Sequence, residues 1–424
     1  MFHRRRAAGF LTAVLALASA GLAIPGTAQA APRSTVTEAV TDKLLGQAAL
    51  AGRAATADRT LVRVNREKGG TWAFGTAVVT APKKEGAAPT GAIFVARAEG
   101  GDWKVAFDGE PGFARLAADS PVVTAEEKKL FASADTAENA DTAENAASAE
   151  TTASPTAAAD AAAGDLSPAD FVRPLANGDY RTGMALPWST GAAWTMTGGP
   201  HQWDGASGPY SSVDFAGGDQ AVRATRAGAA YTLCSGFVRV VHDRGYASDY
   251  YHLTGHVNAD GAAVSQGTFL GYTGTNVACG GSASGRHVHF GLRQNNAYVP
   301  IADHGLGGWV FYATGWYQGY AMHGSTVRNN GSTLHNYGAM GLNQGIVDAN
   351  GGGSVNKRSG PGTGYAVVGS VADGAFVTVS CSRNGTTHQG RFGSTSLWNR
   401  LSDGTWISDA YLWTGYNGAV NGTC

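Results

Sequence analysis

The chain has 424 residues, which is enough for two or three domains. With 43% hydrophobic residues, 15% charged residues and a formal net charge of −1, it can bury a core but offers no large field that would attract nucleic acid or an anionic membrane. The 61 glycines and 10 tryptophans favour a mainly β, turn-rich protein over a helical bundle.

A secretory signal peptide is predicted at residues 1–31. Residues 3–6 give a basic start, residues 9–24 form a mostly apolar run, and residues 28–30 form a small-residue cleavage pattern. A membrane anchor is the weaker reading, because the apolar run is short and is followed by Pro25. Export predicts a secreted, extracellular protein in which disulfides can form.

A small α+β domain is predicted at residues 32–131, with a helix over residues 36–50. Its strands are expected at residues 61–65, 72–79, 92–98 and 103–109. This region contains no cysteine and no histidine, so it lacks the usual metal-binding or nucleophilic chemistry. We expect a propeptide that blocks or chaperones the domain that follows; the alternative is an independent binding domain.

An acidic, Ala-rich linker is predicted at residues 132–165. It contains no lysine or arginine and includes the tandem sequence DTAENADTAENA. Such a composition buries little apolar area and predicts a disordered, protease-accessible segment. A transient helix is the alternative, since alanine and glutamate are good helix formers. Cleavage here or soon after would separate the propeptide and make the chain a zymogen.

The third unit, at residues 166–341, carries the chemistry. Short strands between glycine and proline turns predict a mainly antiparallel sheet with a groove. Its candidate metal-type ligands are His201, Asp214, His252, His287 and His289. Side chains two apart on a strand point to one face, so the last two histidines share a small volume. Two histidines and one aspartate suit catalytic zinc with one open position, which leaves two imidazoles free as general base or hydrogen-bond donor.

The segments GGPH, SSVDF, YYHL and GRHVHF resemble the zinc endopeptidases of the lysostaphin and beta-lytic endopeptidase family, which cut peptides in bacterial cell walls. The 13-position spacing from His201 to Asp214 is similar to that of the beta-lytic subgroup, and the lysostaphin subgroup has a much shorter one. The resemblance covers roughly residues 186–341. It implies one Zn²⁺ held by His201, Asp214 and His289, with His252 and His287 as the catalytic histidines.

Zinc would polarise the scissile carbonyl and lower the pKa of its bound water, while His252 or His287 takes the proton. Which of the two is the base stays open. Tyr250 lies two positions before His252 and is a candidate to orient it, although a tyrosine packed in a sheet is the commoner explanation. Related enzymes use a downstream tyrosine near the oxyanion, for which Tyr312, Tyr317 and Tyr320 are available, and the choice among them stays open.

Residues 342–424 resemble bacterial SH3-like barrels, which bind cell-wall peptides. The recognisable element contains Asn356, Arg358, Ser359, Gly360 and Pro361. We expect Trp398 and Trp406 near the core or the binding face of this domain.

The four cysteines allow three pairings. Cys234 with Cys279 and Cys381 with Cys424 is favoured, because each pair then lies within one predicted domain. A four-cysteine metal site is disfavoured, because no two cysteines are close in sequence.

Two functions remain open. The first is a secreted, monomeric zinc endopeptidase that cuts beside glycine or alanine in peptidoglycan, without nucleic-acid or membrane partners. The second is a non-catalytic wall-binding protein that keeps the fold. The chain lacks the HExxH and GxSxG motifs of other hydrolases. The D-Ala-D-Ala peptidases use a similar ligand set on another fold, and the GGPH and GGW segments favour the first family over them.

Overall fold

The computed structural model describes residues 34–50, 55–133, 178–205 and 208–424. The predicted signal peptide and residues 134–165 of the predicted linker lie outside these ranges. Among the helices that are described, none has the length and apolar character needed to cross a membrane.

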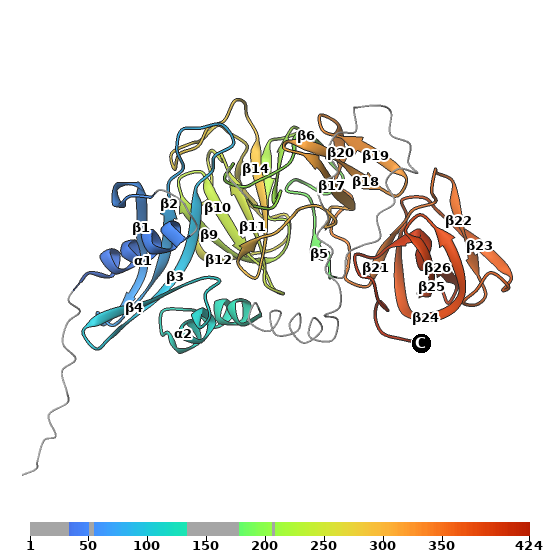
Figure 1. The fold of residues 1–424 in the computed structure, drawn as a ribbon, viewed down its shortest axis with the longest axis horizontal. Helices are drawn as coiled ribbons and strands as arrows, with labels where there is room; N and C mark the ends of the chain where they lie inside the picture. The colour runs from blue at the N-terminus through green and yellow to red at the C-terminus, as the bar shows by residue number, and fades with distance from the viewer. Residues whose placement is uncertain (1–33, 51–54, 134–177, 206–207) are drawn as a thin grey trace, which may run out of the picture.

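The N-terminal part of the chain is a four-stranded antiparallel sheet with a helix against one face (Figure 1). Its elements are α1 (Val36–Leu50), the 3₁₀ turn η1 (Ala57–Arg59), β1 (Thr60–Lys68), β2 (Trp72–Val79), β3 (Thr90–Glu99), β4 (Asp102–Phe107) and α2 (Phe113–Asp119). The helix and the four strands predicted here are confirmed. Successive side chains alternate between faces: Ala73 and Phe94 pack with α1, whereas Phe74 and Val95 face the central sheet.

The central sheet has the strand order β12-β9-β10-β11-β14-β7-β6-β20, with β15 also paired to β14. The strands are β6 (Ala193–His201), β7 (Ser212–Ala216), β9 (Gly228–Cys234), β10 (Phe237–Val241), β11 (Tyr246–Tyr251), β12 (Asp260–Val264), β14 (Val288–Gln294), β15 (Ala297–Tyr298) and β20 (Thr333–His335). All of these pairings are antiparallel, so the predicted mainly β, antiparallel fold is confirmed. As predicted, Val213 and Phe215 on either side of Asp214 lie in the core.

The N-terminal sheet and the central sheet share one hydrophobic cluster. Phe74, Ile93 and Val95 from the first sheet pack with Leu233 and Phe237 from the second. Figure 1 shows the blue strands of the first sheet beside β9, β10 and β12 of the second. The apolar run of β2 and β3 is therefore covered on both faces, as is typical of a strand buried between two layers.

The rest of the chain forms smaller sheets and a C-terminal unit. A two-stranded sheet pairs β8 (Ala221–Arg223) with β13 (Phe269–Tyr272). A five-stranded sheet contains β5 (Arg181–Met184), β16 (Gly305–Leu306), β17 (Trp309–Gly315), β18 (Gln318–His323) and β19 (Thr326–Asn329). The C-terminal sheet contains β21 (Gln344–Val347), β22 (Ser354–Arg358), β23 (Val367–Ala372), β24 (Phe376–Gly390), β25 (Gly393–Leu401), β26 (Trp406–Ser408) and β27 (Leu412–Trp413), with the 3₁₀ turn η3 (Asp409–Tyr411).

The C-terminal sheet curls round on itself, which is compatible with an SH3-like barrel (Figure 1). Trp398 and Trp406 are both buried in it. Both predicted disulfides, Cys234–Cys279 and Cys381–Cys424, are present.

Candidate metal centre

Three adjacent strands bring His201, Asp214 and His289 together. His201 ends β6, Asp214 lies in the middle of β7, and His289 lies directly across from Asp214 on β14. On the other side of Asp214, the partner position on β6 is Gly198, where an added Cβ would stand 2.5 Å from Asp214 Oδ2. A residue without a side chain is therefore needed there to leave room for the carboxylate.

The ligand-type atoms of these three residues converge on one point. His201 Nε2 lies 3.1 Å from His289 Nδ1, and His289 Nδ1 lies 3.0 Å from Asp214 Oδ1. His201 Nε2 is 3.7 Å from the same carboxylate oxygen. All three residues are buried, and one ligand atom from each lies within 4.8 Å of the others.

Hydrogen bonds on the far side of each ring determine the tautomers. His201 Nδ1 donates to the carbonyl of Gly199 at 2.7 Å, and His289 Nε2 donates to the carbonyl of Trp203 at 3.1 Å. The two nitrogens that face each other, His201 Nε2 and His289 Nδ1, are then both lone-pair acceptors. Two such acceptors beside a carboxylate suit a cation between them, and the backbone carbonyls are the usual outer partners of metal-bound histidine. The donor set of two imidazoles and one carboxylate fits Zn²⁺.

Burial and neighbouring charge keep these groups in the protonation states that a metal ion requires. Burial lowers the pKa of His201 to about 4, although the charge of Asp214 opposes this. Burial alone would raise the pKa of Asp214, but the adjacent histidines, His201 first, hold it well below its ordinary value. At neutral pH the first is a neutral imidazole and the second an anion.

His252 and His287 lie beside this cluster with their ring centroids 4.8 Å apart. His252 Nδ1 donates to the carbonyl of Asn276 at 2.9 Å, and His287 Nδ1 donates to the carbonyl of Gly285 at 2.8 Å. In the neutral form of each ring, the Nε2 atom therefore carries the lone pair. Burial first, and then the neighbouring imidazoles, lowers the pKa of His252 to about 3. His287 Nε2 is 3.8 Å from Asp214 Oδ1.

Of the candidate tyrosines Tyr250, Tyr312, Tyr317 and Tyr320, the structure brings Tyr317 to the cluster. Its ring stacks on His201 with centroids 3.8 Å apart, and burial raises its pKa well above the ordinary value of a tyrosine. The hydroxyl of Tyr250 instead accepts a hydrogen bond from Thr225 N in the core. Tyr320 stacks on Tyr312 with centroids 5.0 Å apart, within the cluster that joins β17 and β18 to the C-terminal sheet.

A cleft of about 600 Å³ opens over the cluster. Asp214, His252, His287, His289 and Tyr317 line it on one side. Residues 85–88, from the loop between β2 and β3 of the N-terminal sheet, also line it. Sequence reasoning did not identify this loop, nor the carbonyls of Gly199, Trp203 and Asn276, because every residue has a main-chain carbonyl and only the fold selects which ones act.

Buried ligand atoms on an antiparallel sheet, beside two further imidazoles, form a site of the kind that holds a catalytic metal ion. Residues 209–300 match the model of Peptidase family M23. The chain is 32% identical over 144 residues to the beta-lytic metalloendopeptidase of Lysobacter enzymogenes, covering 31% of this chain and 80% of that protein. The chain belongs to peptidase family M23, and the resemblance predicted from the sequence is confirmed.

The chain is also similar to two further proteins. Protease LasA of Pseudomonas aeruginosa is 36% identical over 135 residues, which are 29% of this chain and 32% of that protein. The chain thus spans about a third of the length of this relative. A solved structure, described as the M23 metalloprotease pseudoalterin from the deep sea, has 32% identity, covers 36% of this chain and 97% of its own, and has a TM-score of 0.34.

Proposed function

We propose that this chain is a secreted zinc endopeptidase that hydrolyses peptide bonds beside glycine or alanine in bacterial peptidoglycan. The convergence of His201 Nε2, Asp214 Oδ1 and His289 Nδ1 on one buried point carries the proposal. Membership of a metallopeptidase family supports it. The low net charge of −1 also suits a peptide substrate better than a polyanion.

In this proposal His201, Asp214 and His289 hold one Zn²⁺, which supplies Lewis-acid polarisation and an activated water. His252 and His287 present unprotonated Nε2 atoms to the cleft, so either can accept a proton at that atom and return it to the leaving amine. Tyr317 stacks on His201 and limits how far that ring can turn.

The N-terminal domain acts as a propeptide that covers the cleft. Its loop lies against the active-site side: Ala81 N donates to Cys279 O at 2.9 Å, and Gly281 N donates to Pro82 O at 3.2 Å. Residues 85–88 then line the cleft itself. Cleavage after residue 131 would allow this domain to leave. The C-terminal unit, residues 342–424, would hold the enzyme on the wall.

Two substitutions test the assignment. His289→Ala should lose both bound zinc and lytic activity, because it removes a ligand atom. His287→Ala should keep zinc and lose activity, because its nitrogen serves the proton transfer. His388→Ala, in the C-terminal sheet, is the control and should change neither. Zinc content by mass spectrometry and release of peptides from purified peptidoglycan give the readout. If the first two variants digest walls as the parent does, the proposal fails.

A further inference from the structure

The segment between β13 and β14 is a closed loop with a catalytic candidate at its base. Two backbone hydrogen bonds join its ends: His287 N donates to Gly274 O, and Gly274 N donates to His287 O, both at 3.1 Å. Residues 275–286 lie between these ends. His287 therefore takes its position directly from the closure of the loop.

The same loop holds the other non-ligand histidine through Asn276. The carbonyl of Asn276 accepts from His252 Nδ1 at 2.9 Å, and its N–H donates to the carbonyl of His252 at 3.3 Å. His252 has φ +67° just after β11 ends, a left-handed conformation that is unfavourable for a non-glycine residue unless its surroundings hold it. The two hydrogen bonds to Asn276 are such a constraint.

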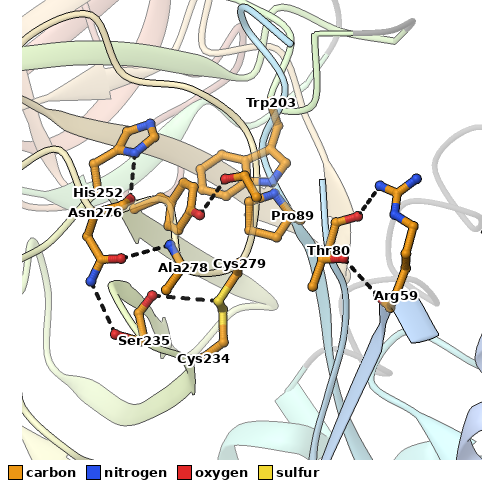
Figure 2. Close-up of a disulfide and its surroundings, with 12 residues drawn as sticks. Arg59, Thr80, Pro89, Trp203, Cys234, Ser235, His252, Asn276, Ala278 and Cys279 are labelled. Carbon is orange, nitrogen blue, oxygen red and sulfur yellow. Dashed lines mark hydrogen bonds between the residues drawn. A yellow bond between two sulfur atoms is a disulfide. The ribbon is translucent and has the colours of Figure 1, made fainter. Parts of the chain in front are cut away.

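Asn276 is itself anchored to the turn between β9 and β10. Its Nδ2 donates to Ser235 Oγ at 3.1 Å, and its Oδ1 accepts from Ala278 N at 2.9 Å (Figure 2). Gly236 lies directly against it, with φ +81° and an added Cβ only 2.7 Å from Asn276 Cγ. The side chain thus fits closely into this turn.

A disulfide fixes the loop to the same turn. Cys279 is 1% exposed and is bonded to Cys234 at the end of β9, next to Ser235 (Figure 2). The neighbouring carbonyl of Gly280 accepts from Tyr251 OH at 2.7 Å. The covalent bond and these hydrogen bonds together hold the loop in a fixed position relative to β9 and β11.

We propose that the Cys234–Cys279 disulfide and Asn276 position the two non-ligand histidines, and that Asn276 sets the tautomer of His252. The ligand residues of the metal lie on β6, β7 and β14, outside the loop, so loosening it should disturb His252 and His287 while sparing metal binding. This inference rests on the proposed function for its catalytic consequence. Its structural part, the Nδ1–H tautomer of His252, stands independently.

The experiment compares two disulfide variants of the full-length chain. Cys234→Ser with Cys279→Ser removes the bond beside the cleft, and Cys381→Ser with Cys424→Ser removes the remote one as a matched control. Three measurements are made: zinc content, ¹⁵N-histidine ring spectra, and kcat and KM for a glycine-alanine peptide after the linker is cut. We expect the first variant to keep zinc, to lose the fixed Nδ1–H signal of His252, and to lose kcat by about 100-fold with KM little changed. The control should match the parent in all three.

Asn276 variants keep the test decisive if the first disulfide variant fails to fold. Asn276→Ala removes the anchor to Ser235 and should loosen the His252 signal and lower kcat. Asn276→Asp can still accept hydrogen bonds from Ala278 N and from the hydroxyl of Ser235. This variant should therefore keep the His252 signal and the kcat of the parent. A parent-like His252 spectrum in Asn276→Ala, or in the folded disulfide variant, would overturn the inference. A parent that shows this spectrum but cuts no peptide would instead refute the proposed function alone.

Discussion

Asp108→Asn should weaken the hold of the N-terminal domain on the rest of the chain. Asp108 follows β4, and its Oδ2 accepts from Arg239 Nη1 of β10 at 2.9 Å, with both side chains buried. The substitution keeps an oxygen for the hydrogen bond from Ile93 N but removes the charge facing the guanidinium. Arg239 retains its two bonds to Asp249, so the substitution removes one charge-assisted hydrogen bond and a longer ion pair, 4.0 Å, with Arg293. Such a bond contributes about 1.5–3 kcal/mol.

That loss corresponds to roughly 10- to 150-fold weaker binding between the two parts once the linker is cut. The dissociation constant is measured by sedimentation of the cut protein over a series of dilutions, with peptidoglycan hydrolysis followed in parallel. Asp243→Asn is the control, because its pair with Arg226 lies within one domain and its side chain is 55% exposed. If Asp108→Asn binds as tightly as the parent and is no more active, the contact does not secure the N-terminal domain.

Three further outcomes are expected. The pKa of Glu127 is lowered from 4.5: burial opposes the shift, but hydrogen bonds from Arg66 and other groups outweigh the effect of burial. The ionised carboxylate therefore stabilises the fold above pH 4.5, and this stabilisation is lost as the pH falls through the pKa of the folded state. Glu127→Gln should cost about 3 kcal/mol in unfolding at pH 7 and flatten the acid limb of the stability curve. Gly198→Ala should lower zinc affinity, because the added Cβ would stand 2.5 Å from Asp214 Oδ2. Gly285→Ala is the control and should leave zinc affinity unchanged, because an added Cβ there has nothing within 4 Å. Calorimetric titration with zinc compares the two variants. A chelator should lower the melting temperature and added zinc restore it, since a ligand that binds only the folded state stabilises it; an unchanged melting temperature would argue against a metal in the native fold.

The sequence predicted those parts of the fold in which local pattern and tertiary position agree. The alternation around Asp214 is one example: Val213 and Phe215 are apolar because they face the core. The histidine pair at the start of β14 is another: His287 directly precedes the strand and His289 lies in it, and their spacing of two puts both rings on the side of Asp214.

The sequence could not predict features that depend on a break in the pattern. Tyr250 was a candidate to orient His252 because two positions separate them on one strand. The strand ends at Tyr251, however, and the left-handed φ of +67° at His252 turns its ring away from the face that Tyr250 occupies. The docking of residues 85–88 at the cleft was equally hidden, since it depends on contacts between segments more than a hundred residues apart.

The shared cluster of Phe74, Ile93 and Phe237 has a consequence for timing. While the chain is intact, the two halves face each other at the high effective concentration of a tether. If the chain is cut as proposed, the same apolar contact becomes bimolecular, and the fraction of the two parts that stays bound depends on the protein concentration. At high protein concentration the two cut parts would stay bound to each other, whereas dilution into a large volume of medium would separate them and free the enzyme.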